Sequence, residues 1–187
     1  MIFRQLFDSA SGTYTYILAS RPGVEALIID PVLEKVDRYL QLIRELDLKL
    51  VKAVDTHLHA DHITGLGALR DRTHCITVMG EQTHADVVSM RVAEGDRVEI
   101  EGLRLDVLYT PGHASHHGSV LDRSSGIALV GDVAGIRIIG RRRYAEFVDR
   151  ELQRHLSGPR SLPHRVGATF ELSWLGLARY WRKRGVL

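Results

Sequence analysis

Four side chains that can bind a metal ion lie within six residues of this sequence. They form an H-x-H-x-D-H pattern at His57, His59, Asp61 and His62. A lone histidine is usually a core or surface residue, but three histidines and an aspartate at this spacing indicate a ligand set. The pattern directly follows the apolar run 48–54, a predicted strand. Because alternate side chains of an extended segment share a face, His57 and His59 are predicted to point into one cavity.

Two later positions repeat this combination of a strand end and a metal-binding side chain. His113 follows Pro111-Gly112, a pair that forces a sharp turn after the predicted strand 103–109. Asp132 follows the apolar run 127–131, where a carboxylate needs a partner or a metal ion. Three strand ends would then supply the metal ligands, which we predict to be His57, His59, His113 and Asp132.

The remaining polar residues near these ligands have supporting or open roles. Asp61 and His62 lie past the strand end and are our candidate catalytic residues, which would serve a second metal ion or support the first. Asp30 ends another apolar strand, and we expect it to hold the His-rich loop by accepting backbone N–H bonds. His116 and His117 follow His113 closely, and the pattern leaves open whether they line the pocket or face solvent.

Length and composition are those of one ordinary globular domain, which we assign to residues 1–187. No apolar run approaches the roughly 20 residues that a membrane-spanning helix needs. Cys75 is the single cysteine, which excludes an internal disulfide and fits a reducing compartment. We expect no membrane association, and a cytoplasmic protein if the source is bacterial or a mitochondrial-matrix protein if it is eukaryotic. A homodimer is compatible with the sequence.

Charge is unevenly distributed along the chain. Residues 1–140 have a net charge of −5, whereas residues 141–187 have +7, giving +2 in total. The basic C-terminal segment 141–187 could face an anionic substrate, a nucleic acid or only water. A non-catalytic nucleic-acid-binding protein is one hypothesis, but a charge of +7 is modest for that task, and we do not expect nucleic acid as a partner.

Strands come first in runs and then alternate with helices. Short β-branched or aromatic runs predict strands at 2–7, 13–19, 24–29, 48–54, 75–79, 98–100, 103–109, 120–121 and 127–130. Apolar residues at helical spacing predict helices at 32–46, 63–72, 81–90, 144–156 and 172–184. This order favours an α/β fold in which two layers of strand pack face to face with helices outside.

The three motifs together resemble those of the metallo-β-lactamase superfamily. They are His57 through His62, Thr110-Pro111-Gly112-His113 and Gly131-Asp132. The resemblance implies an αββα sandwich of two mixed sheets, with outer helices and the metal site at one edge of the sheets. The C-terminal third diverges from the family pattern.

The first 113 residues are most similar to the persulfide dioxygenase (sulfur dioxygenase) branch. The matching stretches are 2–8, 13–16, 29–32 and 55–65. This resemblance implies one Fe(II) held by His57, His113 and Asp132, an arrangement that leaves positions open for O₂ and substrate. It also implies oxidation of glutathione persulfide to sulfite and glutathione. Arg137 and Arg141 stand where that family has arginines, and we predict that they bind the glutathione carboxylates.

A metal-dependent hydrolase is the alternative that the sequence leaves open. The stretch 114–117 with 131–137 is more similar to hydrolase-type members, and Arg143 replaces an acidic residue of the dioxygenase pattern. One or two zinc ions on the same ligands, with Asp61 and His62, would activate water against a thioester, as in glyoxalase II, or a lactone. A later Pro-Gly-His segment, which serves the second metal of dinuclear hydrolases, is missing, and this weakens the two-metal interpretation.

Overall fold

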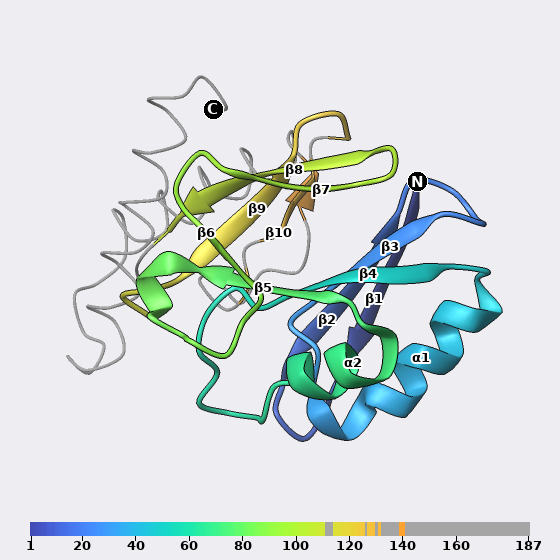
Figure 1. Ribbon diagram of the computed structural model, residues 1–187, viewed down its shortest axis with the longest axis horizontal. Coiled ribbons are helices and arrows are strands. Elements are labelled where there is room, and N and C mark those ends of the chain that lie inside the picture. The colour runs from blue at the N-terminus through green and yellow to red at the C-terminus, as the bar shows by residue number, and fades with distance from the viewer. Residues whose placement is uncertain (111–113, 126, 130, 132–138, 141–187) are drawn as a thin grey trace, which may run out of the picture.

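Two β-sheets packed face to face form the described part of the chain (Figure 1). The structure is a computed structural model and describes residues 1–110, 114–125, 127–129, 131 and 139–140. Helices α1 and α2 cover the outer face of the first sheet, and the second sheet covers its inner face (Figure 1). In the described residues, no helix is long and apolar enough to cross a membrane.

The first sheet is mixed and has the strand order β1-β2-β3-β4-β5-β6. Its strands are β1 Ile2–Phe7, β2 Tyr14–Ala19, β3 Glu25–Ile29, β4 Lys49–Val54, β5 Ile76–Gly80 and β6 Met90–Val92. β1, β2 and β3 pair antiparallel, whereas β3 through β6 pair in parallel. The parallel strands end at the same edge of the sheet, so the residues that follow β3 and β4 lie side by side.

Two short helices cover the outer face of this sheet. A single 3₁₀ turn, η1 Leu33–Lys35, leads into α1 Val36–Glu45, and α2 spans Leu66–Thr73. α1 buries Val36, Tyr39 and Ile43 at helical spacing, and α2 buries Leu66 and Leu69. These side chains pack with Ile17, Ile28, Leu50 and Ala53, so β2, β3 and β4 are covered on both faces. The predicted helices at 32–46 and 63–72 are confirmed: α1 is shorter at both ends, and α2 begins three residues later than predicted and ends one residue later.

The second sheet is antiparallel, with the strand order β11-β10-β9-β8-β7. Its strands are β7 Arg97–Ile100, β8 Leu103–Tyr109, β9 Gly118–Asp122, β10 Ile127–Leu129 and β11 Ile139–Gly140. The expectation of two mixed sheets therefore holds for the first sheet only. The link of residues 101–102 joins β7 to β8 as a tight hairpin, and hairpins pair strands antiparallel. The predicted helices at 144–156 and 172–184 lie outside the described residues.

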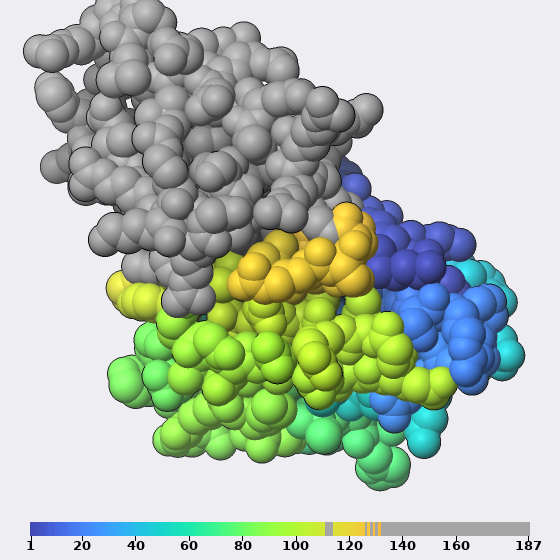
Figure 2. Space-filling model, turned by 90° about the horizontal axis from the view of Figure 1, so that it is seen from above, coloured from blue at the N-terminus to red at the C-terminus, as the bar shows by residue number. Residues whose placement is uncertain are grey.

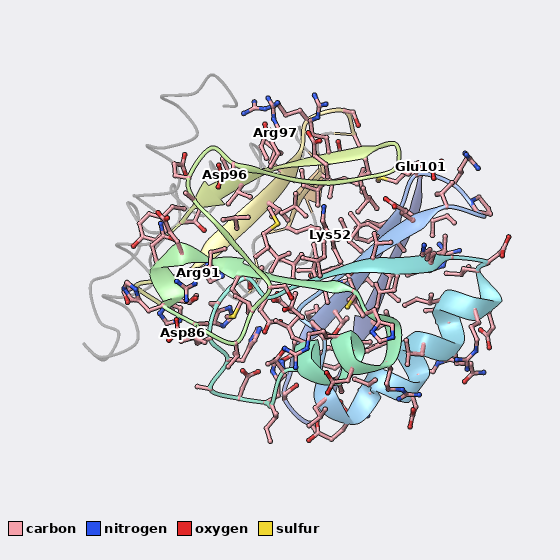
Figure 3. The ribbon with its side chains drawn as sticks, in the orientation of Figure 1. Lys52, Asp86, Arg91, Asp96, Arg97 and Glu101 are labelled. Atoms are coloured by element: carbon pink, nitrogen blue, oxygen red, sulfur yellow. The ribbon has the colours of Figure 1, made fainter. Side chains whose placement is uncertain are left out.

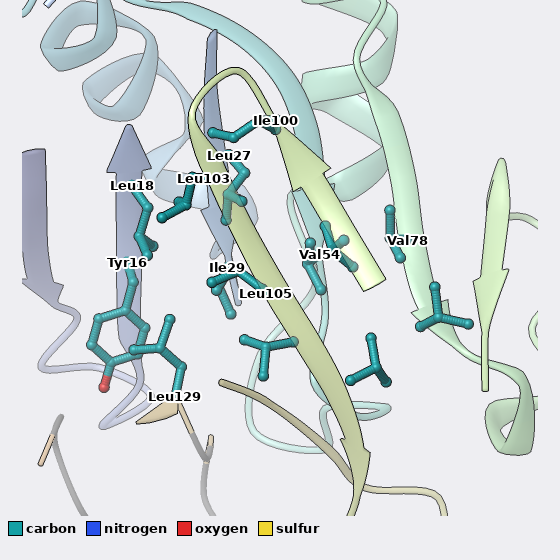
Figure 4. Packing of buried hydrophobic residues seen from close by; sticks show 14 residues of the cluster. Tyr16, Leu18, Leu27, Ile29, Val54, Val78, Ile100, Leu103, Leu105 and Leu129 are labelled. Carbon is teal, nitrogen blue, oxygen red and sulfur yellow. The ribbon is translucent and has the colours of Figure 1, made fainter. Parts of the chain in front are cut away.

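The main hydrophobic core lies between the two sheets (Figure 4). Leu18, Leu27 and Ile29 project from the first sheet toward Leu105 and Leu129 of the second (Figure 4). β8 alternates buried and less buried residues, as expected for a strand with one face on the core. The sheets also touch at one end, where the blue N-terminal residues meet the yellow-green hairpin (Figure 2).

Polar contacts fix the relative position of the sheets at that end. The hydroxyl of Ser20 donates to the carbonyl of Glu101, 2.8 Å away, and Arg21 pairs with the Glu101 carboxylate at 2.9 Å. Lys52 of β4 reaches across and donates to the carbonyl of Glu99 on β7 (Figure 3). The opposite end of the sandwich contains the His-rich loop.

The predicted helix over 81–90 is wrong. Only a 3₁₀ turn, η2 Glu81–Thr83, forms there, and β6 follows it. His84 adopts a left-handed conformation (φ 52°) that ends the turn. The backbone N–H of Ser89 then donates to the hydroxyl of Thr77 on β5 at 2.9 Å, and Arg91 pairs with Asp86 (Figure 3). These contacts hold the segment, which turns at 86–87, against the neighbouring strand β5.

We expect Leu105→Ala to lower the free energy of unfolding by about 2–5 kcal/mol, because it leaves a cavity between the two sheets. Leu105 is 1% exposed. The matched control is Ile76→Ala, since Ile76 is a strand residue of similar size that is 43% exposed and should cost less than about 1 kcal/mol. Urea denaturation of both variants measures the difference. Equal losses would contradict this placement of the core.

Candidate metal centre

The three histidines of the H-x-H-x-D-H pattern are close together at the end of β4. The His57 and His59 ring centroids are 4.2 Å apart, as are those of His59 and His62. His57 is 1% exposed, and the side chains of His59 and His62 are similarly buried. Asp61 is partly exposed, with 35% of its side chain accessible. The structure therefore brings together the four residues that the sequence singled out in this loop.

Asp30 holds this loop from the neighbouring strand end. One carboxylate oxygen accepts the backbone N–H of Thr56 at 2.7 Å, and the other accepts the Thr56 hydroxyl at 2.9 Å. Nε2 of His59 lies 3.3 Å from the first oxygen. Burial alone would raise the pKa of Asp30, but the bonds from His59 and Thr56 lower it below the ordinary value. The expected role of Asp30 as an acceptor of a backbone N–H bond is confirmed.

Hydrogen bonding determines which ring nitrogen of His57 carries the lone pair. The hydroxyl of Thr56 has one hydrogen, which it donates to Asp30. Thr56 Oγ1 therefore accepts a hydrogen bond from Nδ1–H of His57, 3.0 Å away. This tautomer puts the lone pair of His57 on Nε2. His59 has the opposite tautomer. Its Nε2 faces the carboxylate of Asp30 and carries the hydrogen, so its lone pair is on Nδ1.

The same logic applies to Asp61 and His62, which contact the turn between β1 and β2. The Thr13 hydroxyl donates to Asp61 Oδ2 at 2.8 Å and lies 3.1 Å from His62 Nδ1. Since Thr13 has one hydroxyl proton, His62 donates through Nδ1 and carries its lone pair on Nε2. Burial works against ionisation of Asp61, but the bonds from Thr13 and His62 lower its pKa.

Asp55 adds a second buried carboxyl beside Asp30. Its side chain is 1% exposed, and its Oδ1 lies 3.9 Å from Nε2 of His59. Burial and the negative charge of Asp30 raise the pKa of Asp55 to about 7. Two carboxylates this close disfavour simultaneous ionisation unless a cation lies near them.

His116 and His117 connect the β8–β9 turn to the His-rich loop. Nε2 of His116 accepts the backbone N–H of Leu58 at 3.1 Å. His117 is fully buried, and its ring stacks on His57 with centroids 5.0 Å apart. Sequence reasoning left both residues open. One sequence feature could have singled out His117: it directly precedes Gly118, the glycine that begins β9, and so lies at a strand end like the predicted ligands.

Four predicted site residues lie outside the described part of the chain: His113, Asp132, Arg137 and Arg141. Their roles stay predictions. Two residues that precede the predicted ligands are described, however. Thr110 Oγ1 lies 3.1 Å from Nδ1 of His117, and a Cβ atom on Gly131 would lie 2.8 Å from Nε2 of the same ring. The ends of β8 and β10 therefore meet beside His57.

These donors suit a divalent metal ion. One ligand atom from each of His59, Asp61 and His62 falls within 4.8 Å of the others, and the same is true of Asp30, Asp55 and His59. Imidazole and carboxylate ligands of this kind bind iron and zinc alike. A cavity of about 230 Å³ lies against His59 and His62, with apolar walls that include Leu66, Met79 and Val88. The site thus combines buried donors with room for a small molecule.

The chain belongs to the metallo-beta-lactamase superfamily, whose family profile matches residues 10–161. It is 40% identical over 147 residues to mouse mitochondrial persulfide dioxygenase ETHE1, a match that covers 78% of this chain and 58% of the mouse protein. The crystal structure of ETHE1 from Myxococcus xanthus is 50% identical and superposes with a TM-score of 0.61, over 65% of this chain and 54% of that one. The chain thus spans little more than half the length of these relatives.

A hydrolase matches a shorter stretch. Hydroxyacylglutathione hydrolase from Rhodopseudomonas palustris strain HaA2 is 39% identical over 71 residues, which is 37% of this chain and 28% of the hydrolase. The αββα sandwich expected from the sequence agrees with these comparisons and with the two packed sheets.

We expect Asp30→Asn to weaken binding of a divalent metal by about 10- to 100-fold, because the amide cannot accept from both Thr56 donors and His59 together. Asparagine tolerates the left-handed backbone at this position (φ 50°). The control is Asp47→Asn, an exposed aspartate with φ 53° far from the loop. Chelator competition on both proteins measures affinity. Unchanged binding by Asp30→Asn would contradict the role of Asp30.

The metal-free protein should lose stability relative to Asp55→Asn as pH rises. In the folded protein the pKa of Asp55 is about 7, against an ordinary value of 3.8, so ionisation costs more in the folded than in the unfolded state. The free energy of unfolding of the wild type therefore falls between about pH 4 and pH 7, and the variant lacks this contribution. Urea denaturation at pH 5 and pH 8 compares the two. If the difference in free energy of unfolding between the two proteins were no larger at pH 8 than at pH 5, the prediction would be wrong.

Proposed function

We propose that this protein is a non-haem iron persulfide dioxygenase. Glutathione persulfide, O₂ and water would yield glutathione, sulfite and two protons. The ligands would be His57, His113 and Asp132, with iron(II) as the metal ion. The observation that carries the proposal is the 40% identity to mouse persulfide dioxygenase over 78% of the chain, together with a buried histidine cluster at the shared strand edge.

Residues of this chain would prepare the site before substrate arrives. His57, His113 and Asp132 would hold iron(II), which would supply the redox chemistry with O₂ and the persulfide. The Thr56–Asp30 hydrogen bonds fix the His57 tautomer, so that Nε2 presents its lone pair without rearrangement. Holding both reactants at one centre removes much of the entropic cost of their encounter. The cavity beside His59 and His62 offers room for the substrate.

Arg137 and Arg141 are our candidates for binding the glutathione part of the substrate. A guanidinium group matches a carboxylate with two parallel N–H bonds, and glutathione carries two carboxylates. The net charge of +7 in residues 141–187 would attract the same anion. Replacing either arginine should raise KM for glutathione persulfide more than it lowers kcat. The reason is that the arginines would bind the glutathione part equally in the ground state and in the transition state.

A zinc-dependent hydrolase of a thioester or lactone is the second candidate. The observation that favours it is the His59, Asp61 and His62 group, whose ligand atoms lie within 4.8 Å and would suit a second ion. The match to hydroxyacylglutathione hydrolase points the same way over a shorter stretch. Zinc would lower the pKa of bound water toward about 7 and so provide hydroxide.

Metal content and oxygen uptake decide between the two. The purified chain should bind one iron per protein and, when loaded with iron(II), consume O₂ on addition of glutathione persulfide. Zinc loading should leave O₂ uptake at background, and S-lactoylglutathione should not be hydrolysed by either form. Absence of O₂ uptake by fully iron-loaded protein, or thioester hydrolysis with two zinc ions bound, would overturn the dioxygenase proposal.

His62→Asn tests the number of ions directly. In a one-ion centre His62 supports the ligands, so we expect the variant to retain one metal ion per chain with an affinity lowered by about tenfold. In a two-ion centre the stoichiometry would drop from two to one. The control is His84→Asn, an exposed histidine whose left-handed backbone asparagine also tolerates. Elemental analysis after dialysis gives the count.

The proposed setting follows from the same relatives. We infer a cytoplasmic protein if the source is bacterial and a mitochondrial-matrix protein if it is eukaryotic, as the word "mitochondrial" in the name of the mouse relative suggests. The proposed partners are a small thiol persulfide and O₂. A homodimer remains our proposal for the assembly, which light scattering on the purified chain measures.

A further inference from the structure

We propose that His117 is a positioning residue for the metal centre: it fixes the imidazole of His57 and the strand ends that precede His113 and Asp132. The inference rests on the proposed ligand set, but not on which reaction that centre performs. His117 is fully buried and directly precedes β9. A buried imidazole needs a polar partner, which Thr110 provides, and the ring also lies beside His57 and Gly131, so it adjoins three different strand ends.

The first contact is with His57 itself. The two rings stack with centroids 5.0 Å apart and planes inclined by 28°. Nδ1 of His57 is engaged with the Thr56 hydroxyl at 3.0 Å. With one edge bonded and one face covered, the His57 ring cannot rotate about its side-chain bonds without losing a contact. His117 therefore limits the directions in which Nε2 of His57 can point.

The second contact ties His117 to the end of β8. Nδ1 of His117 lies 3.1 Å from Thr110 Oγ1, which in turn lies 2.7 Å from the hydroxyl of Ser119. The backbone N–H of Thr110 also donates to the carbonyl of His117 at 3.0 Å. Thr110 immediately precedes the Pro-Gly-His segment. The ring thus holds the residue from which the chain turns toward His113.

The third contact is with the end of β10. Gly131 has a left-handed backbone (φ 48°), and a Cβ atom there would lie 2.8 Å from Nε2 of His117 and 2.5 Å from Thr56 Oγ1. Such separations exclude any side chain, so only glycine lets this strand end approach the ring. Asp132 is the next residue. One imidazole therefore stacks on His57, lies 3.1 Å from the hydroxyl of Thr110, and lies beside Gly131, so it adjoins the residues directly before both other predicted ligands.

A plain core residue would fill the same space, but the two roles differ in what a variant changes. If His117 only fills volume, a residue of similar size restores the site along with the fold. If it positions ligands, filling the volume restores the fold without the metal affinity. While the metal-free protein stays almost fully folded, its metal affinity does not depend on its free energy of unfolding. Metal affinity and the free energy of unfolding can therefore be measured as separate effects of one substitution.

The experiment compares three substitutions in the full chain, with cobalt(II) as the probe. His117→Leu keeps an apolar volume and removes both nitrogens. His117→Asn keeps an amide near the position of Nδ1, facing Thr110, and His117→Gln keeps one near Nε2, facing Gly131. Affinity comes from chelator competition, ligand geometry from the cobalt absorption spectrum, and the folded fraction from urea denaturation of the metal-free proteins. Asp122→Asn, at the far end of the same strand, is the control.

We expect His117→Leu to lower cobalt affinity by about 10- to 100-fold and to shift the cobalt spectrum, whereas Asp122→Asn leaves both unchanged. His117→Asn should recover most of the affinity, because it restores the partner of Thr110. If His117→Leu does not fold, Thr110→Val tests the same link, and we expect a smaller loss with a shifted spectrum. Wild-type affinity and spectrum in every folded variant, or no cobalt binding by the wild type, would overturn the proposal.

The outcomes also separate this inference from the proposed reaction. Wild-type protein that binds metal but takes up no O₂ with glutathione persulfide removes the dioxygenase function and leaves the role of His117 intact. Protein that takes up O₂ while His117→Leu binds cobalt with wild-type affinity and an unchanged spectrum removes the role of His117 and leaves the function intact.

Discussion

The metal centre depends on the hydrogen bonds that the buried carboxylate of Asp30 accepts from the His-rich loop. An ionised group removed from water is costly unless donors surround it, and here Thr56 supplies two hydrogen bonds while His59 supplies a third contact. The parallel pairing of β3 with β4 brings the donors to the acceptor, because both strands end at one edge. The apolar sheet behind the loop therefore fixes its position, and the hydrogen bonds of Asp30 and Thr56 determine the ring tautomers of His57 and His59.

Sequence reasoning succeeded where the cause is local. The H-x-H-x-D-H pattern, the apolar strands before it and the aspartate at the end of β3 are all visible within a few residues, and the structure has the helices and strands near the predicted positions. Buried strands of a parallel sheet read as continuous apolar runs, which is why β3 was found, and β4 is apolar except at Lys49 and Lys52. The order of strands and helices already favoured two layers of strand packed face to face, and the family resemblance added the position of the metal site at one edge of the sheets.

What the sequence missed depends on contacts between distant segments. In place of the helix expected over 81–90 the chain forms the short η2 turn and an irregular segment that leads into β6, and β6 is a strand because it pairs with β5. The bond from Thr13 to Asp61 spans 48 residues and arises only because the β1–β2 turn folds against the His-rich loop. His117 was left open for the same reason, since its contacts lie on three strand ends.

The hydrogen bonds of Thr13 favour a one-ion over a two-ion centre. Its hydroxyl occupies Oδ2 of Asp61, and Nδ1 of His62 lies 3.3 Å from the same oxygen, so the pair is already held in a closed network. A second ion coordinated by Asp61 would have to bind through Oδ1 or compete with this network for Oδ2. In a one-ion centre the network needs no change, because Thr13, Asp61 and His62 keep their mutual hydrogen bonds. Asp30 alone then holds His59, through Nε2 at 3.3 Å, as expected of a group that supports a ligand.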